Sequence, residues 1–543
     1  MKQLWVFSLA LATAVAAQAA PPRLERQGDT QQLIVDGKPF LILGGELGNS
    51  SASSAQYMHD HWPRLRAMHL NTVVAPVYWE LIEPMEGRFD WSSVDALLRD
   101  ARASDLKLVV LWFGAWKNSM STYVPSWVKR DQQRFPRAQL ADGSSVEILS
   151  AFSRTTRDAD ARACSALMAH LAEVDSRDST VLMVQVENEI GMLPIARDRS
   201  AVADRLFGGA VPVELMRSLA ARGARLEPEL RDLWKKNGSR SSGTWAQVFG
   251  DDEWGQEVFT AWHYARFADA LAQAGKKKYA LPMYANVALN RPNKKPGEYP
   301  SGGPLPHLID VWKAGAPSLD FLAPDIYFPN FPDLMARYRR DDNVLFTPEA
   351  NNAGKSEGPA NAFYAFGALD SLSFSPFSIE SIDQQQPNPL AQAYSVLEQL
   401  TPLILENRGT GKMAGFKPRV LFDGTVIDTP QTRIFGGIEL TVNFIDPWTP
   451  KDQQDVASHG GLVIYAGGED FWFAGQGMVV TYKGADQGPP LVGIDLAEEG
   501  VFDEHGEWKP GRRLNGDQTH QGRHLRLAPG QFQIQKVRLY RYQ

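Results

Sequence analysis

Hydrophobic runs of strand length alternate with longer segments of helical spacing through most of the chain. The strand-like runs are rich in Val, Ile and Leu and lie at 41–46, 72–79, 106–112, 181–189, 278–285, 319–328, 344–349 and 372–379. Between them, apolar residues recur every three or four positions over 61–69, 92–101, 159–174, 253–274 and 390–406, as in amphipathic helices. Strand followed by helix, repeated about eight times, predicts an α/β fold with a closed parallel (β/α)8 TIM barrel.

Finer signals mark several boundaries within this pattern. Asp36-Gly37 predicts the turn of a short N-terminal hairpin over 33–40. Ser92 and Asp95 form a pair like a capping box at the start of one helix. Gly275 predicts the end of the helix at 253–274. A further helix is expected at 213–222, inside an elaborated loop.

The pattern changes after about residue 409. Short alternating runs follow at 461–466, 470–473, 478–483 and 533–542, with Gly, Pro and Asp between them. This spacing predicts a smaller, all-β sandwich domain over 410–543, roughly 130 residues in the usual size range of one domain. The catalytic barrel with its N-terminal hairpin is then predicted over 20–409.

The first 19 residues have the pattern of an export signal. Lys2 supplies a positive charge, residues 4–16 are apolar, and Ala17-Gln18-Ala19 is a small-x-small cleavage site. A membrane anchor is the alternative, but the apolar stretch is short for a bilayer-spanning helix. We therefore expect residues 1–19 to be a signal peptide and the mature protein to be periplasmic or extracellular, without a membrane anchor.

Composition and charge narrow the function classes. The chain has 543 residues, of which 43% are hydrophobic and 22% charged, enough for a large domain and a smaller one. Its net charge is −7 with no basic block, which argues against nucleic acid as a partner. The single cysteine, Cys164, excludes an intrachain disulfide and a cysteine-based metal site.

Two of the predicted strands end in a carboxylate. By our count Glu189 ends the fourth strand and Glu349 the seventh. A carboxylate at the end of a buried strand costs desolvation energy unless it is paired or used. Because the C-terminal strand ends of a parallel barrel converge on one face, the two acids are predicted to meet there. Two facing carboxylates are what glycosidic bond cleavage needs, and two separate ion pairs are the alternative.

Two neighbours of Glu189 have separate predictions. Glu187 lies on the same strand face, one pleat deeper, and is predicted to be a buried structural acid paired with an Arg or Lys. Asn188 is a candidate for binding a sugar hydroxyl, with a cap at the loop tip as the alternative.

Several motifs together resemble glycoside hydrolase family 35. Residues 185–191 (Gln-Val-Glu-Asn-Glu-Ile-Gly) are similar to its acid/base signature. Residues 78–84 (Tyr-Trp-Glu-Leu-Ile-Glu-Pro) resemble a second-strand signature shared by families 35 and 42. Residues 281–284 and 374–380 also resemble bacterial members, and the trailing sandwich is similar to the C-terminal domain of a bacterial branch.

The resemblance implies a retaining exo-β-galactosidase that needs no metal or organic cofactor. Glu189 would be the acid/base and Glu349 the nucleophile. Tyr327 falls where the broader clan places a tyrosine that bonds the nucleophile, with a rim aromatic as the alternative. Tyr78 and Trp116 are candidate galactose contacts, with packing in the barrel as the alternative. Glu46 is a further candidate contact.

The chain departs from better-known relatives at Gly114-Ala115-Trp116, where they carry an acidic residue before the tryptophan. This difference leaves the galactose contacts of the third-strand loop open. The substrate hypothesis is galactose side chains of xyloglucan, so the expected partners are oligosaccharides or plant cell-wall polysaccharide fragments.

Two other functions remain open at this point. One is another exo-glycosidase of the same clan, such as a β-glucosidase or an α-L-arabinopyranosidase. The other is a carbohydrate-binding barrel without catalysis. In the sandwich, Phe471, Trp472 and Phe473 are either a carbohydrate-binding strip or sheet core.

Overall fold

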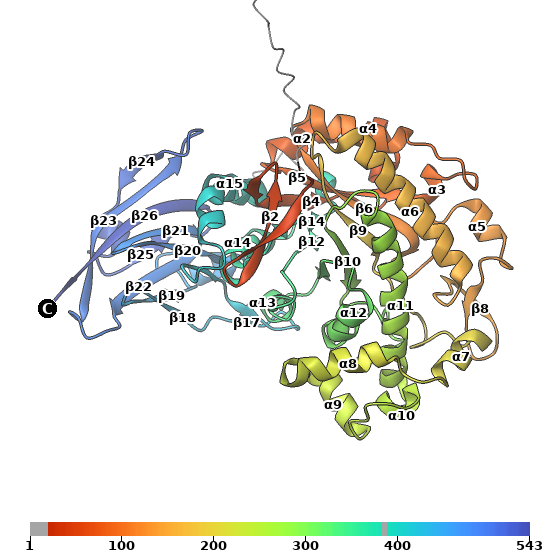
Figure 1. Cartoon of the computed structure of the whole chain (residues 1–543). Coiled ribbons are helices and arrows are strands. Elements are labelled where there is room, and N and C mark those ends of the chain that lie inside the picture. The colour runs from red at the N-terminus through yellow and green to blue at the C-terminus, as the bar shows by residue number, and fades with distance from the viewer. Residues whose placement is uncertain (1–19, 383–387) are drawn as a thin grey trace, which may run out of the picture.

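The computed structural model describes residues 20–382 and 388–543, and the predicted signal peptide at 1–19 lies outside the described residues. Figure 1 shows a larger part, with helices around a central sheet, beside a smaller part made of strands. Within the described ranges, no helix has both the length and the apolar character that crossing a bilayer requires.

A parallel sheet closed on itself forms the centre of the larger part. Its strands are β4 (Ile42–Glu46), β5 (Thr72–Tyr78), β6 (Lys107–Lys117), β9 (Val181–Asn188), β10 (Met283–Ala288), β11 (Phe321–Ile326) and β12 (Glu349–Asn352). The short strands β13 (Ser373–Phe374) and β14 (Pro376–Phe377) share the eighth position and pair with β4, which also pairs with β5. The predicted (β/α)8 barrel is therefore confirmed.

Helices surround the barrel strands. The main ones are α2 (His61–Ala67), α4 (Ser92–Ala103), α6 (Arg154–Asp175), α11 (Glu253–Lys276), α12 (Ile309–Gly315), α14 (Gly358–Leu369) and α15 (Pro389–Asn407). The N-terminus of α11 is capped by Asp252, whose side chain accepts a hydrogen bond from Gly255 N–H. The predicted capping box of α4 is wrong, because Ser92 is already the first helical residue and the preceding residue makes no side-chain cap.

An excursion between β9 and β10 holds four further helices. They are α7 (Ala201–Phe207), α8 (Val213–Arg222), α9 (Pro228–Lys236) and α10 (Trp245–Phe249). The predicted helix at 213–222 is confirmed as α8. At the N-terminus, β2 (Thr30–Val35) and β3 (Lys38–Phe40) form the predicted hairpin, and β1 (Arg23–Gln27) adds a third strand.

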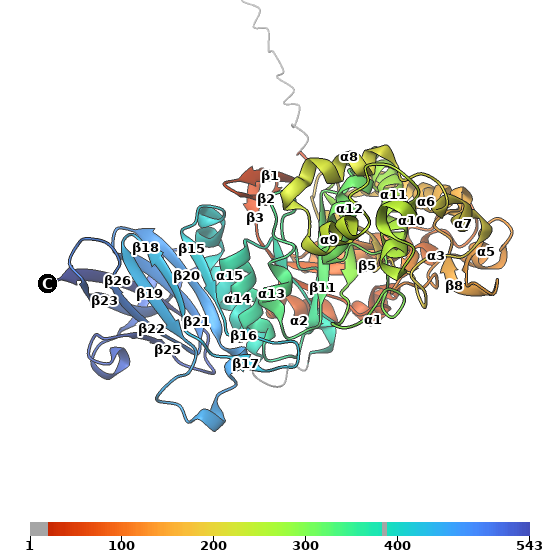
Figure 2. The same cartoon turned by 90° about the horizontal axis from the view of Figure 1, so that it is seen from below.

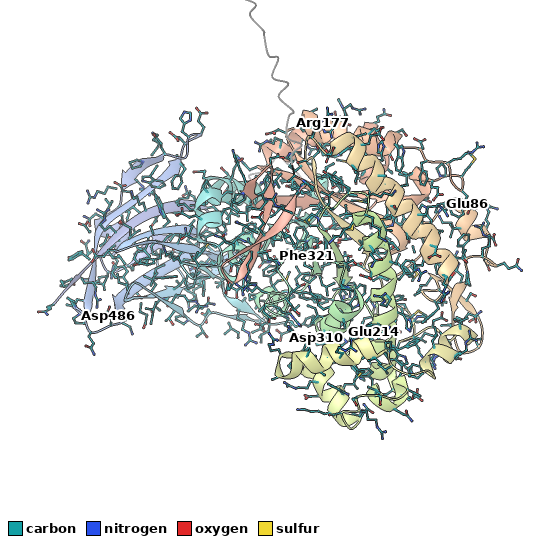
Figure 3. All side chains as sticks on the ribbon, in the orientation of Figure 1. Glu86, Arg177, Glu214, Asp310, Phe321 and Asp486 are labelled. Atoms are coloured by element: carbon teal, nitrogen blue, oxygen red, sulfur yellow. The ribbon has the colours of Figure 1, made fainter. Side chains whose placement is uncertain are left out.

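The barrel interior is a packed core. Its larger buried rings include Phe113 of β6, Tyr284 of β10, Phe321 of β11 and Phe346 before β12. Figure 3 shows Phe321 at the centre of the barrel and Asp310 outside it, on the helical layer. Because the interior is filled below this level, space for chemistry is left at the C-terminal strand ends.

The seventh strand differs from its prediction. Residues 344–347 have no strand pairing, and β12 begins at Glu349 instead of ending there. A serine side chain replaces the ladder at this point: Thr347 N–H donates to Ser373 Oγ (3.2 Å), which donates back to the Thr347 carbonyl (3.1 Å). The hydrophobic pattern alone does not predict that a side-chain hydroxyl takes the place of backbone hydrogen bonds here.

The smaller part is a sandwich of two antiparallel sheets. One contains β15 (Met413–Phe416), β20 (Gly460–Gly467), β21 (Asp470–Gln476), β26 (Gln533–Tyr542), β23 (Leu491–Phe502) and β24 (Trp508–Arg513). The other contains β18 (Gln431–Phe435), β19 (Ile438–Asn443), β22 (Met478–Gly484) and β25 (Leu525–Leu527). Phe471 and Phe473 lie in the core between the sheets, and the buried Trp472 packs on Phe502 and Trp508. The aromatic run is therefore sheet core and offers little surface to a sugar.

The sandwich packs on the barrel through α14 and α15 (Figure 2). Gly367 of α14 faces Gly415 of β15 so closely that a Cβ on Gly367 would lie 2.9 Å from the Gly415 Cα. A hairpin of β16 (Arg419–Val420) and β17 (Val426–Ile427) extends from the sandwich to α13 (Phe331–Met335) on the barrel. The two domains thus meet beside the loops that follow the barrel strands.

Candidate active site

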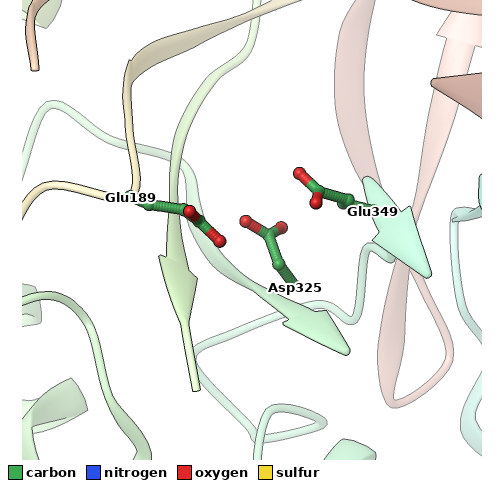
Figure 4. A group of neighbouring side chains, drawn as sticks. All are labelled: Glu189, Asp325 and Glu349. Atoms are coloured by element: carbon green, nitrogen blue, oxygen red, sulfur yellow. The ribbon is translucent and has the colours of Figure 1, made fainter. Parts of the chain in front are cut away.

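Three carboxylates meet at the C-terminal end of the barrel (Figure 4). Glu189 directly follows β9, Asp325 lies near the end of β11, and Glu349 begins β12. Each offers a carboxylate oxygen, and these three oxygens all lie within 4.8 Å of one another. All three residues are buried. The structure therefore brings Glu189 and Glu349 together, and it adds Asp325.

The backbone around Glu189 is held in an unusual conformation. Glu187 and Glu189 have φ values of 61° and 47°, in the left-handed region that non-glycine residues rarely adopt. Asn286 of β10 fixes this turn, because its Oδ1 accepts the Glu189 N–H at 2.9 Å. The same amide donates from Nδ2 to Asp325 Oδ2 at 2.5 Å. One side chain thus orients two of the three acids.

Each of the two predicted catalytic acids has a neutral donor. The Tyr327 hydroxyl donates to Glu349 Oε1, and the Asn118 amide donates to Glu189 Oε2. Lys117 is the cation beside them; it is buried, and its Nζ donates to Asn188 Oδ1 at 2.9 Å. The Asn188 Nδ2 has no partner among the described residues. A buried donor with no partner is suited to a ligand acceptor.

A fourth acid belongs to this group. Glu46 is the last residue of β4, is 1% exposed, and interacts electrostatically with both Glu349 and Glu189. We call Glu46, Glu189, Asp325 and Glu349 the site cluster. Glu46 ends the first barrel strand and Asp325 lies in the sixth, and nothing in the sequence indicates that these two acids meet. From the sequence, Glu46 is therefore only a further candidate, and Asp325 is not predicted.

Burial and mutual repulsion control the protonation of the site cluster. Burial raises the pKa of Glu46 and of Asp325 well above their ordinary values, and the charge of Glu349 raises both further. Burial also raises the pKa of Glu349, to about 7, with Glu189 adding to the shift. Lys117 and hydrogen bonds from Tyr327 and Glu46 oppose that rise. Burial and the neighbouring carboxylates therefore favour the protonated forms of Glu46 and Asp325.

Three carboxylates at this spacing are also a set that a hard divalent cation can bind. Two features favour proton sharing over metal binding here. The positive charge of Lys117 lies beside the cluster, and Glu189 and Glu349 already accept hydrogen bonds from Asn118 and Tyr327.

A second acid pair lies beneath the site and holds the third-strand backbone. Asp160 of α6 accepts Trp112 Nε1–H (2.8 Å) and Ala115 N–H (2.9 Å), and Glu187 accepts Trp116 N–H (2.7 Å). The predicted structural role of Glu187 fits this position, but its predicted Arg or Lys partner is wrong, because Glu187 bonds Asp160.

Gly114 lies directly against this acid pair. A Cβ on Gly114 would lie 2.8 Å from Asp160 Oδ1 and 2.9 Å from Glu187 Oε1. Any larger residue would have to displace two buried carboxyl groups, so glycine is required here.

The two aromatic candidates for sugar contact are both buried. Trp116 has no exposed surface and packs on Tyr264 and Phe267, because β6 continues to Lys117 and turns this side chain toward α11. Its burial favours the packing alternative over a galactose contact. Tyr78 is 3% exposed and lies against Phe113 and Tyr123.

Two segments of the chain match known family models. Residues 32–209 match the family model for glycosyl hydrolases family 35, and residues 390–526 match a domain of unknown function (DUF5597). A β-galactosidase of Xanthomonas manihotis is 31% identical over 205 residues, covering 36% of this chain and 31% of that protein. Beta-galactosidase 8 of Oryza sativa subsp. japonica is 30% identical over 188 residues, covering 34% of this chain and 26% of that protein.

The chain therefore spans less than a third of the length of either relative. Among solved structures, the catalytic domain of β-amylase from Paenibacillus polymyxa is similar at 14% identity and a TM-score of 0.48, covering 66% of this chain and 98% of that one. The family match contains Lys117, Asn188 and Glu189, whereas Asp325 and Glu349 lie beyond it. The part of the barrel that carries Glu189 is therefore similar to glycosyl hydrolases family 35.

Proposed function

We propose that the protein is a retaining exo-β-galactosidase that removes terminal β-D-galactosyl residues. The observation that carries this proposal is the meeting of Glu189 and Glu349, from the fourth and seventh strands, at the C-terminal end of one barrel. The family match and the two β-galactosidase relatives support the choice of galactose.

In the first step Glu349, ionised, attacks the anomeric carbon of the galactoside. A bond forms between that carbon and a Glu349 oxygen, and the bond to the leaving oxygen breaks. Glu189 gives its proton to the leaving oxygen. In the second step Glu189 takes a proton from water, which attacks the same carbon and releases galactose and Glu349. Two displacements at one carbon retain its configuration.

The spacing of the acids favours retention over inversion. Inverting enzymes need room for a water molecule between carboxyl groups ~6.5–9.5 Å apart, whereas retaining enzymes hold them at ~5–5.5 Å. Carboxylate oxygens of Glu189 and Glu349 lie within 4.8 Å of each other. This separation suits direct attack by Glu349.

Neighbouring groups have roles consistent with this cycle. Tyr327 steadies the attacking carboxylate, and Asn118 steadies the acid/base. The free Nδ2 of Asn188 is placed to donate to the sugar hydroxyl next to the reacting carbon. These contacts provide orientation, which lowers the entropic part of the barrier.

For the leaving group we propose an oligosaccharide, with galactose-terminated side chains of xyloglucan as the natural source. Tyr327 is partly exposed, the next residue is Phe328, and Phe328 packs edge-on against the partly exposed Phe422 of the sandwich hairpin at 5.0 Å. Aromatic faces are the usual platform for sugar rings. The pattern of residues 1–19 supports export, so we propose that the enzyme acts in the periplasm or outside the cell.

One experiment tests the function directly. The purified protein is incubated with xyloglucan oligosaccharides, with lactose, and with nitrophenyl β-galactoside, β-glucoside and α-L-arabinopyranoside, and the released sugar is identified. We expect galactose from the galactosides and little release from the others. Preferred release of glucose or arabinose would assign a different exo-glycosidase, and binding without hydrolysis would assign a non-catalytic barrel.

A further inference from the structure

We propose that Glu46 is a positioning residue that keeps a proton and donates it in a hydrogen bond to Glu349, the attacking carboxylate. The inference rests on the proposed function for the role of Glu349, but the contact itself is testable without any substrate. Glu46 would act through Glu349 and would not touch the reacting carbon.

The fold places Glu46 firmly. It ends β4, where it pairs in register with Phe377 of β14. The two preceding glycines allow the first and eighth strands to approach: a Cβ on Gly44 would lie 2.3 Å from Ser375 Oγ, and one on Gly45 would lie 2.4 Å from Ile379 Cγ1. The Glu46 backbone is therefore fixed by close packing on both sides of the strand.

Glu46 and Glu349 can form a hydrogen bond with each other only if one of the two carboxyl groups carries a proton. Both Glu46 oxygens and Glu349 Oε2 are buried without a donor among the described residues. As two carboxylates, neither side chain can donate to the other, and their charges repel. With one proton on Glu46, the side chains form the hydrogen bond that their geometry allows. A buried polar group left without a partner would cost ~1–3 kcal/mol.

The surrounding groups favour this proton. Among the described residues that act on Glu46, Lys117 is the cation, and the other titratable neighbours are acids or phenols. Those neighbours come from five other barrel positions and are Lys117, Glu189, Tyr284, Asp325, Tyr327 and Glu349. A protonated Glu46 reduces the negative charge of the cluster and at the same time steadies the one carboxylate that must be ionised.

Glu349 would then have a donor on each oxygen. Tyr327 donates to Oε1 and Glu46 donates to Oε2. Hydrogen bonds to the charged form of an acid lower its pKa. Two neutral donors thus keep a buried nucleophile ionised without an adjacent guanidinium, whose charge would hold the carboxylate too tightly to attack.

The test compares Glu46→Gln with Glu46→Ala through the pH dependence of kcat/KM. The acidic limb reports ionisation of Glu349 in the free enzyme. A glutamine amide can still donate a hydrogen bond to Glu349, so the acidic limb of Glu46→Gln should stay in place. Alanine cannot donate this hydrogen bond, so the acidic limb of Glu46→Ala should move to higher pH by about one unit. If Glu46 is instead charged, both variants remove a repulsive charge and both limbs move to lower pH, which overturns the proposal.

A spectroscopic measurement decides the question without activity. In protein labelled with ¹³C at the glutamate carboxyl groups, Glu46 should give a resonance with the chemical shift of a protonated carboxyl group at pH 7. This resonance should be absent from the spectrum of Glu46→Gln. Glu187→Gln identifies the resonance of Glu187, whose pKa is also raised by burial. Unchanged protonated resonances in Glu46→Gln would refute the proposal even if the protein hydrolyses no galactoside. Glu257→Gln, which removes a buried acid outside the site, is the control and should leave the acidic limb unchanged.

Discussion

Two groups of acids in this barrel have opposite electrostatic surroundings. On the outer helical layer, Arg340 donates to Asp310 (2.5 Å), Asp342 (2.9 Å) and Glu227 (3.2 Å), and Arg222 adds a second guanidinium. We call these five residues the outer ion network. In the site cluster, four acids share a single lysine. All acids of the site cluster are buried, whereas in the outer ion network Asp310 is buried and Asp342 and Glu227 are partly exposed. Guanidinium groups compensate the acids of the outer ion network, and no described guanidinium does so in the site cluster.

The difference appears in the proton affinities. Burial raises the pKa of Asp342, but the hydrogen bond and charge of Arg340 outweigh it, so this pKa lies below its ordinary value. In the site cluster the pKa values of Glu46, Asp325 and Glu349 are all raised. Paired acids hold the fold together, whereas unpaired buried acids store the proton affinity that acid–base chemistry uses.

The largest expected effect comes from removing the two central acids. Glu349→Gly and Glu189→Ala should each lower kcat on nitrophenyl β-galactoside by ~10³-fold or more, because the first variant lacks the nucleophile and the second lacks the proton donor. Both variants should keep a cooperative thermal transition, since each removes a charge from an uncompensated cluster. A Glu349 variant with near-normal rates would contradict the assignment.

The outer ion network should show the reverse behaviour. Arg340→Met removes the hydrogen bonds to Asp310, Asp342 and Glu227 and leaves Arg222 and Arg337 as their remaining partners, so it should lower the free energy of unfolding by ~1–3 kcal/mol in urea titrations. The kcat of the folded fraction should be unchanged. The matched control is Arg512→Met, which breaks an exposed pair with Glu499 and should cost less than ~1 kcal/mol. Equal losses in the two variants would remove the distinction between the networks.

The acid pair under the third strand predicts a pH effect. Burial raises the pKa of Glu187 well above 4.5, and burial raises that of Asp160 to about 6. A raised acid pKa means that the folded protein keeps protons that the unfolded chain releases. This contribution is fully present below about pH 4 and is lost as pH rises through the folded pKa values.

Glu187→Gln supplies the donor to Asp160 without needing a proton. Its free energy of unfolding should therefore fall less than that of the wild type between pH 4.5 and 8, by more than ~1 kcal/mol. Denaturant titrations at several pH values measure this difference. The exposed Glu504→Gln is the control and should follow the wild type. An equal or steeper fall in Glu187→Gln would show that the pair does not share a proton.

The smallest expected effect lies at the junction of the two domains. Phe422→Ala removes one aromatic face beside Phe328 and should raise KM for xyloglucan oligosaccharides about 5-fold to 10-fold, which is about 1 kcal/mol. The KM for methyl β-galactoside should stay the same. Ile427→Ala, in the same hairpin, should leave both substrates unaffected. A similar change for both substrates would place the effect in folding instead of leaving-group binding.

Much of this arrangement follows from the sequence. The alternation of strand and helix gave the barrel and the strand count, and the count placed Glu189 and Glu349 on one face. Strand periodicity also made Glu187 a structural acid. These predictions succeeded because burial and strand ends are encoded by local hydrophobic patterns.

Other features depend on contacts between distant segments. Strand seven begins at Glu349 because Ser373 replaces its backbone ladder. Trp116 packs on α11 because β6 continues to Lys117, beyond the predicted strand end at 112. Asp325 and Glu46 are single acids in their own strands, and the acids beside them come from other strands. No local sequence pattern therefore predicts that they lie next to other acids.

The account depends most on the different roles of Glu349 and Glu189. A 2-deoxy-2-fluoro-β-galactoside with a good leaving group slows the second displacement and traps the glycosyl-enzyme. Mass spectrometry of the digested protein should then find one fluorogalactosyl group on the peptide that contains Glu349, and none on Glu349→Gly. A label on Glu189 or on any other residue, or hydrolysis of galactosides with inverted configuration and no label, would contradict the account.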